Sequence, residues 1–138
     1  MMQRPRMQVA AVTIGAPDPR ALAAFYERML GWPLVNEDAA DPGDPPEDVW
    51  AQLRPPPGET GPTLNFEFER HYVPPVWPSV VGEQHITEHL DIAVDDLNET
   101  VAWAVAAGAT LAAYQPQDDV RVLFDPAGHP FCLFLTQA

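Results

Sequence analysis

Hydrophobic and polar residues alternate along residues 88–96. In an extended chain Leu90, Ile92 and Val94 point to one side, and the polar or small residues between them point to the other. This pattern predicts a β-strand with one buried face and one polar face. His89 belongs to the polar face, so this face is also a candidate for chemistry.

A helix is predicted directly after this strand. Asp96 is a suitable N-cap, Glu99 three residues later completes a capping box, and apolar residues then recur at helical spacing. Gly108 follows the last of them, at a place where glycine commonly ends a helix. We therefore predict a helix over residues 97–108.

The same strand and helix occur earlier in the chain. Residues 10–16 alternate in the same way, and Asp18-Pro19 supplies an N-cap followed by proline at the first helical position. Apolar residues at helical spacing then continue up to Gly31, so a helix is predicted over residues 19–30. The two copies are about 78 residues apart and indicate an internal repeat.

Three further strands are predicted after each helix. They cover residues 33–36, 49–54 and 64–69 in the first copy, and residues 110–114, 120–124 and 131–135 in the second. The predicted fold class is α+β, with one domain over residues 1–138 made of two β-α-β-β-β modules, residues 8–70 and 86–136.

A proline-rich linker joins the modules over residues 71–87. Proline cannot donate to a sheet, so this segment is predicted to lie outside both sheets. Its Tyr72 and Trp77 either cover a pocket or anchor the linker. His71 and His129 lie in loop-like sequence and are expected to be solvated.

Charge excludes some functions. The formal net charge is −13, from 20 acidic residues against seven arginines and no lysine, so binding to nucleic acid or to an anionic membrane is not expected. The charge serves either solubility or an acidic groove for a cationic ligand. A Schiff base is excluded because lysine is absent.

A cytoplasmic location is expected. The chain has no apolar run of the roughly 20 residues that a membrane span needs, and its first residues do not resemble a signal peptide. Cys132 is the single cysteine, so an internal disulfide is excluded and a reducing compartment fits.

Several motifs together resemble the vicinal oxygen chelate superfamily, which includes glyoxalase I, bleomycin-resistance proteins and extradiol dioxygenases. They are the Asp18-Pro19 to Tyr26 run, Leu30-Gly31-Trp32, the segment 89–97, and Asp125-Pro126-Ala127-Gly128, within the doubled modules. The match looks closest to the small glyoxalase-like branch. The resemblance implies that each module curls a mixed sheet into a cup, with its helix on the outside.

The resemblance also implies positions for a divalent ion, which metal-dependent members hold with four side chains from the first and last strands of both modules. In this sequence those positions are Ala11, Glu67, His89 and Cys132. The alternation along the strands independently places all four opposite the face that packs on the helices. Ala11 has no ligand atom, and Cys132 stands where the metal enzymes usually have glutamate.

The sequence therefore favours a cup without a tightly held metal. The leading hypothesis is a protein that binds a small organic ligand, cationic or aromatic, as the resistance proteins do. The candidate ligand-binding residues are polar or aromatic side chains expected around the cup: Trp50, Gln52, Arg54, Asn65, Tyr72, Trp77 and Phe134.

The alternative is a metal-dependent lyase, isomerase or dioxygenase. Glu67 and His89 are then the catalytic candidates, and Glu67, His89 and Cys132 hold zinc, nickel, manganese or iron. A degenerate fold kept as an interaction partner is a third possibility. The sequence does not determine whether the protein is an enzyme, nor the identity of its ligand.

A homodimer is expected as well. Trp103 lies off the apolar stripe of the second predicted helix, and an exposed aromatic side chain of this kind is often buried by a partner. Whether the two modules of one cup belong to one chain or are exchanged between two chains is left open.

Overall fold

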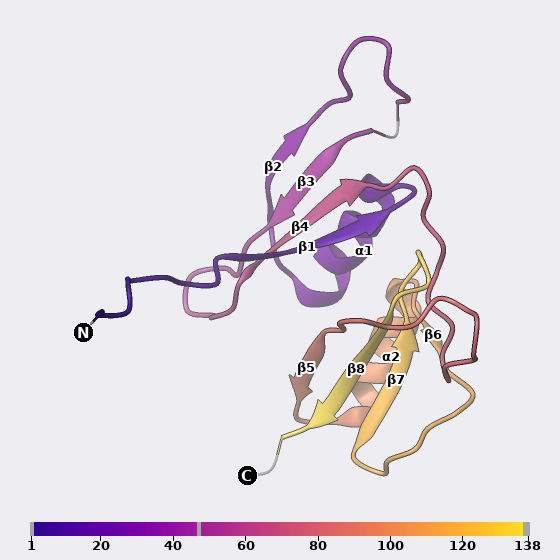
Figure 1. The fold of residues 1–138 in the computed structure, drawn as a ribbon. Coiled ribbons are helices and arrows are strands. Elements are labelled where there is room, and N and C mark those ends of the chain that lie inside the picture. Colours follow the sequence, from indigo (N-terminus) through magenta and orange to yellow (C-terminus); the bar gives the residue numbers. More distant parts are fainter. Residues whose placement is uncertain (1, 47, 137–138) are drawn as a thin grey trace.

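The structure is a computed structural model, and it describes residues 2–46 and 48–136. Its first module contains β1 (Ala11–Ala16), α1 (Pro19–Leu30), β2 (Leu34–Asp38), β3 (Trp50–Leu53) and β4 (Thr63–Phe68). The strands form sheet A in the order β1-β4-β3-β2, in which β1 and β4 are parallel and the other neighbours antiparallel (Figure 1).

The second module repeats this topology. It contains β5 (Asp91–Val94), α2 (Leu97–Ala107), β6 (Thr110–Leu111), β7 (Val120–Phe124) and β8 (Pro130–Leu135). Sheet B has the order β5-β8-β7-β6, again with the first pair parallel. The predicted α+β fold of two β-α-β-β-β modules with mixed sheets is confirmed.

Both helices begin at the predicted caps. The carboxylate of Asp18 accepts a hydrogen bond of 3.1 Å from the backbone N–H of Ala21, and that of Asp96 accepts one of 2.9 Å from Glu99. Gly31 ends α1 with φ at 70°, in the left-handed region that glycine adopts without strain. Local sequence therefore fixes both helices to within a residue or two.

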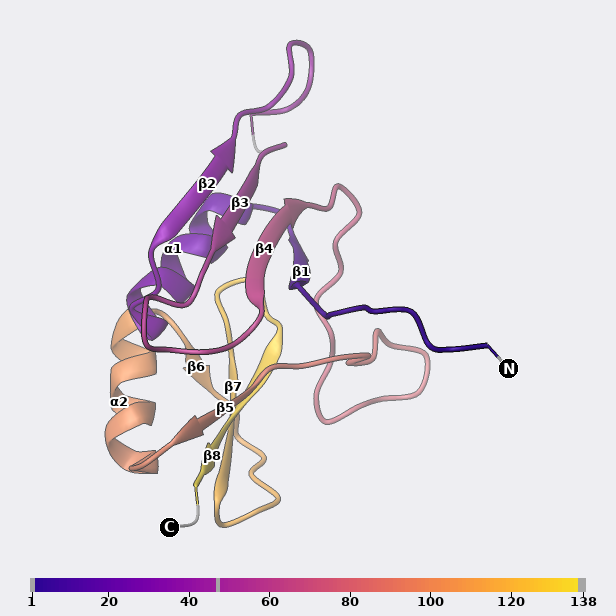
Figure 2. The ribbon, with the colours of Figure 1, turned by 90° about the vertical axis from the view of Figure 1, so that its left-hand side faces the viewer.

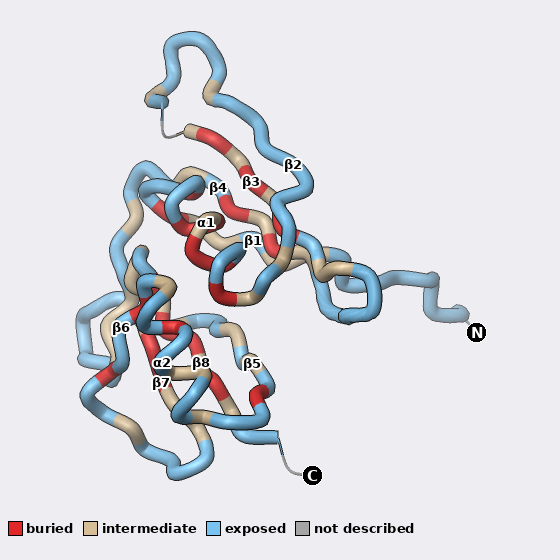
Figure 3. Tube along the Cα trace, turned by 180° about the vertical axis from the view of Figure 1, so that it is seen from behind, coloured by how far each residue is buried: buried red, intermediate tan, exposed pale blue. Residues whose placement is uncertain are grey.

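The two helices lie on the same side of the two sheets and contact each other (Figure 2). The buried core lies between them and the sheets (Figure 3), and it includes Phe25, Tyr26, Phe66 and Phe131. Polar contacts also join the helices, because the indole N–H of Trp103 donates to the carbonyl of Met29 at 3.0 Å and the guanidinium of Arg28 donates to that of Ala107 at 2.7 Å. The opposite face of each sheet carries no helix, and we call these the open faces of sheet A and sheet B.

Two predicted strands are shorter than expected. The strand predicted from the alternation of residues 88–96 covers only Asp91–Val94, so His89 lies just before it. The strand predicted over residues 110–114 ends at Leu111, although Ala112 still donates to the carbonyl of Val122 at 3.0 Å. Beyond that point the side chain of Gln115 replaces backbone pairing: its amide N–H donates to the Val122 carbonyl and its carbonyl accepts from the Val122 N–H. A side chain has therefore taken over the hydrogen bonds that the strand would have made.

None of the described helices is both long enough and apolar enough to cross a membrane.

Candidate functional site

The open face of sheet B forms the floor of a hollow of about 630 Å³. The linker supplies Trp77 and Ile86 to its wall, and the loop before β7 supplies residues 116, 117 and 119. The floor consists of side chains from β5, β7 and β8: Asp91, Val120, Val122, Cys132 and Phe134. Apolar walls with a few polar groups are the usual composition of a small-molecule site.

Strand alternation places these side chains in the hollow. Phe131 and Leu133 of β8 are buried against the helix side, so Cys132 and Phe134 between them point to the open face. Val122 is the register partner of Cys132. A one-residue shift of β8 would bury the thiol and expose both large apolar side chains, so packing of the core fixes the face on which Cys132 lies.

Three potential metal ligands among the lining residues of this hollow lie close together. Ligand atoms of His89, Asp91 and Cys132 all lie within 4.8 Å of one another. The imidazole Nδ1 of His89 is 3.2 Å from a carboxylate oxygen of Asp91, and the side chains of these two residues are 40% and 57% exposed. The cluster is therefore open to whatever enters the hollow.

The environment of Cys132 disfavours its thiolate. Burial raises the pKa of the thiol, and the charge of the Asp91 carboxylate and a hydrogen bond to it raise the pKa further. Without a cation beside it, the sulfur is held as a thiol. Cys132 by itself is therefore not an activated nucleophile.

The open face of sheet A carries a polar row. The side-chain amide of Gln52 donates to the carbonyl oxygen of Asn65 at 2.8 Å, and Arg54 donates to Gln52 at 3.3 Å. Trp50 and Glu67 are register partners at the end of this row, and Glu67 is exposed. Four of the predicted ligand-binding residues thus lie on this face together with Glu67.

The single chain does not bring Glu67 into the cluster of His89 and Cys132. Glu67 belongs to sheet A, and it is not a member of the ligand cluster that His89 and Cys132 form with Asp91 on sheet B. Glu67 and His89 thus belong to different modules, and because both helices lie on one side of the two sheets, both open faces lie on the other side (Figure 2). That Glu67 and His89 share one cup stays a prediction. The role of Glu67 in binding stays a prediction.

The two aromatic residues of the linker have different surroundings. Trp77 lines the hollow and packs against Tyr114 with ring centroids 5.4 Å apart. Tyr72 packs against His129 instead, at 5.2 Å, and its buried hydroxyl has no hydrogen-bond partner among the described residues. Trp77 thus lines the hollow on sheet B and Tyr72 does not, and the role of either residue in ligand binding stays a prediction.

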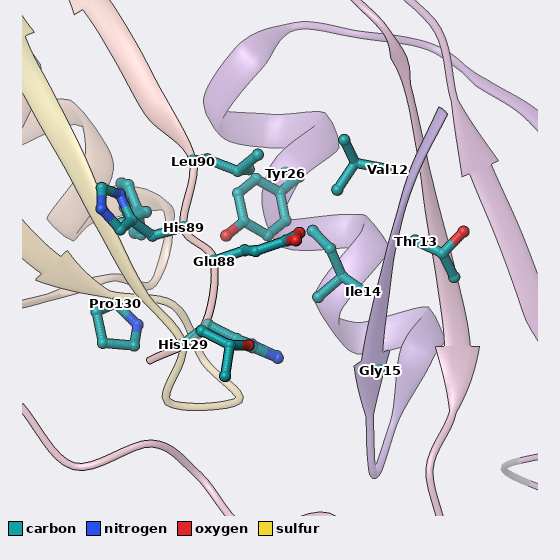
Figure 4. Close-up of a pocket in the computed structure, with 12 residues that line it drawn as sticks. Val12, Thr13, Ile14, Gly15, Tyr26, Glu88, His89, Leu90, His129 and Pro130 are labelled. Atoms are coloured by element: carbon teal, nitrogen blue, oxygen red, sulfur yellow. The ribbon is translucent and has the colours of Figure 1, made fainter. Parts of the chain in front are cut away.

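A second cavity of about 280 Å³ lies between the two modules (Figure 4). It is bounded by residues 12–15 of β1, by residues 87–90 and by residues 129–131. Glu88 and His89 leave the backbone on opposite sides, with Glu88 directed toward Ile14 and His89 away from β1 (Figure 4). His89 therefore lines both this cavity and the hollow on sheet B.

His129 is not solvated as expected. Its ring Nδ1 lies 3.0 Å from both carboxylate oxygens of Asp125, and only 23% of its side chain is exposed. Asp125 is buried, and it also accepts hydrogen bonds from the phenol of Tyr26 and from the backbone N–H groups of Ala127 and His129. The loop-like sequence around His129 did not indicate this network, because the donor Tyr26 lies in the other module.

Asp91 is the member of the ligand cluster that the sequence analysis missed. It precedes β8 by some forty residues but is the direct register partner of Cys132 on the neighbouring parallel strand. The signal was present in the alternation, because residues two apart in an extended chain share a face and His89 and Asp91 have that spacing.

The family model described as a glyoxalase-like domain matches residues 11–134. No curated protein sequence gives a significant match.

Many solved structures have a similar fold. A glyoxalase/bleomycin resistance protein/dioxygenase family enzyme from Burkholderia phytofirmans PsJN is 21% identical, with a TM-score of 0.66, over 95% of this chain and 100% of its own. TnmS3, an antibiotic binding protein from Streptomyces sp. CB03234, is 15% identical, with a TM-score of 0.59, over 98% and 100%. The trypanothione-dependent glyoxalase I of Leishmania major is 19% identical, with a TM-score of 0.59, over 94% and 87%. At these identities the likeness concerns the fold, which one binding protein and two enzymes share.

Proposed function

The chain belongs to the glyoxalase-like domain family, within the vicinal oxygen chelate superfamily, and we propose that it binds a small organic ligand on the open face of sheet B. The observation that carries this proposal is the hollow of about 630 Å³, in which Val120, Val122 and Phe134 provide an apolar floor. A volume of this size suits a drug-sized molecule.

The polar groups of the hollow suggest the ligand's chemistry. Asp91 lies on the floor and Asp119 on the wall, and the whole chain has a formal net charge of −13. Trp77 offers an indole face that could stack on a flat ring or attract a cation. An aromatic or cationic organic molecule fits this surface better than an anion does.

We infer further that two copies of the chain associate. Both sheets of one chain have an open face, and the face of sheet A presents Trp50, Gln52, Asn65 and Glu67 to the outside. In a symmetric dimer, the open face of sheet A from one copy would close the hollow on sheet B of the other, and Glu67 would then reach the ligand. A mass equal to one chain at micromolar concentration would rule this arrangement out.

Thermal unfolding in the presence of small organic compounds tests the binding proposal. A compound that binds the folded state raises the midpoint of unfolding with the logarithm of its concentration, and aromatic cations are expected to be the strongest binders. Val120→Ala removes apolar surface from the hollow and should lower the affinity for the compound that the screen identifies. Val105→Ala makes the same truncation on the exposed side of α2 and should leave that affinity unchanged. Equal effects of both variants would place the site elsewhere.

An enzyme is the second candidate, favoured by His89 and Cys132 lying together. Of the four positions that the superfamily uses for its metal, Ala11 has only a methyl group and Glu67 is on the other sheet, so the four do not form a metal site within one chain. In such an enzyme His89 would act as a base or a metal ligand. Glu67 of a second copy of the chain would act as the general base. A lyase, isomerase or dioxygenase activity lost in both His89→Ala and Glu67→Gln would favour it over binding alone.

A further inference from the structure

His89, Asp91 and Cys132 form a set of donors that belongs to the second module alone. The parallel pairing of β5 with β8 makes Asp91 the register partner of Cys132, and His89 precedes Asp91 by two residues on the same face. The backbone N–H of Cys132 donates to the carbonyl of Leu90 at 2.9 Å, so the ladder between the strands extends past the start of β5 and holds this segment in place. Two neighbouring strands thus hold Asp91 and Cys132, and the bond to Leu90 holds the segment that carries His89 just before β5.

The geometry points to a site for a thiophilic divalent ion, such as zinc, held by His89, Asp91 and Cys132 of a single module. Zinc binds imidazole nitrogen and carboxylate oxygen at about 2.0 to 2.2 Å and thiolate sulfur at about 2.3 Å, so tetrahedral ligands lie about 3.3 to 3.7 Å apart. The present ligand atoms lie within 4.8 Å of one another, and the imidazole Nδ1 of His89 is 3.2 Å from the Asp91 carboxylate. Small side-chain rotations are enough to bring the three ligand atoms to these separations, because His89 and Asp91 are exposed and free to rotate.

The chemistry of the donors selects the ion. A thiolate, an imidazole and a carboxylate together suit zinc, whereas calcium and magnesium prefer oxygen ligands alone. Coordination of the sulfur transfers the Cys132 proton to solvent, so one proton is released for each ion bound. Three protein ligands leave a fourth position for a water or a ligand, and all three ligands line the hollow.

This donor set differs from the one that the superfamily implies. Asp91 is not among the four implied positions, and neither Ala11 nor Glu67 is needed. The inference deepens the proposed function, because the ion would lie in the proposed ligand site, but it does not require that a ligand binds there. It also does not require a dimer, since one module supplies every ligand.

Titration of the reduced, metal-free full chain with Co²⁺ and Zn²⁺ tests the site. Co²⁺ bound by Cys132 should give the near-ultraviolet absorption of a cobalt–thiolate bond. This absorption should saturate at one Co²⁺ per chain and should disappear when Zn²⁺ displaces the Co²⁺. Asp91→Asn keeps the shape of the side chain and should weaken binding more than about tenfold. Because Asp91 is exposed, this variant should unfold like the parent when metal-free.

Glu83→Gln, at an exposed linker glutamate outside the cluster, is the matched control and should bind the ion as tightly as the parent does. The site is refuted if Co²⁺ gives no thiolate absorption, or if Asp91→Asn binds as tightly as the parent. It is also refuted in its present form if Glu67→Gln loses the ion, because the ligands would then come from both modules. Binding of an organic compound by the metal-free chain would leave the proposed function intact whichever result the metal titration gives.

Discussion

The phenol of Tyr26, in α1 of the first module, donates a hydrogen bond of 2.8 Å to the carboxylate of Asp125, in the turn between β7 and β8 of the second. Both groups are buried, and 99 residues separate them in sequence. The carboxylate is the buried acceptor at which Tyr26, His129 and two backbone N–H groups converge. This contact joins the modules and holds the turn that leads into β8.

Tyr26→Phe should therefore destabilise the protein. Loss of a buried hydrogen bond to a charged group costs about 1.5 to 3 kcal/mol in free energy of unfolding, measured by chemical denaturation. Tyr72→Phe is the matched control: its hydroxyl has no partner among the described residues, so its removal should be neutral or stabilising. Equal losses in the two variants would contradict the assigned role of Tyr26.

Stability should also fall at high pH. Burial, followed by the charge of Asp125 and the hydrogen bond to it, raises the pKa of Tyr26 well above the usual value of about 10. Above that pH the unfolded chain loses this proton while the folded chain keeps it, so the folded state binds more protons. The free energy of unfolding then decreases as pH rises, by up to about 1.4 kcal/mol per pH unit for this group.

Chemical denaturation between pH 8 and about pH 11 measures this slope. Tyr26→Phe has no phenol at this position, so its stability should fall less steeply than that of the parent. Tyr114→Phe is the control, because that phenol is exposed in the folded protein. Identical slopes for the parent and Tyr26→Phe would show that Tyr26 does not cause the loss.

Gly128→Ala should weaken the attachment of the linker. Gly128 has φ at 94°, and a Cβ there would lie 2.9 Å from the Cβ of Pro74, so the turn or the linker must shift. We expect a loss of about 1 to 3 kcal/mol in stability. Gly43→Ala is matched in backbone conformation, with φ at 93° and no atom near the new Cβ, and should cost less. Equal costs would mean that contact with Pro74 does not matter.

Gln115→Ala should loosen the loop that walls the hollow. The Gln115 side chain makes hydrogen bonds to the carbonyls of Ala112 and Val122 and to the N–H of Val122, all between 2.8 and 2.9 Å. Their loss should lower stability by about 1 to 3 kcal/mol and speed hydrogen exchange in residues 112–119. Gln117→Ala, in the same loop but exposed, should change neither measurement, and a similar response of both variants would contradict the role of Gln115.

Glu67→Gln should separate a role in binding from a role in folding. Glu67 is exposed, so its substitution should leave the unfolding of the ligand-free protein unchanged. If a second copy presents Glu67 to the ligand, affinity for a cationic compound should fall by about 1.5 to 3 kcal/mol, measured by calorimetry. Glu83→Gln, an exposed linker glutamate, is the control. Parent-like affinity in Glu67→Gln would confine the ligand to sheet B.

The sequence alone determined the elements and the face on which each side chain lies. Alternation along 88–96 and the caps Asp18 and Asp96 are local signals, since they depend on residues within one strand or one turn. For that reason both helices were predicted to within a residue, and Cys132 and Phe134 were placed on the open face.

Tertiary structure decided which of these faces meet. Glu67 lies on sheet A, outside the ligand cluster of the second module, and the β5-β8 register brings Asp91 beside Cys132. The hydrogen bond from Tyr26 to Asp125 likewise depends on the packing of the first module against the second. Such contacts depend on how two modules pack over long sequence separations, and a hydrophobic pattern specifies which face is buried without specifying what it is buried against.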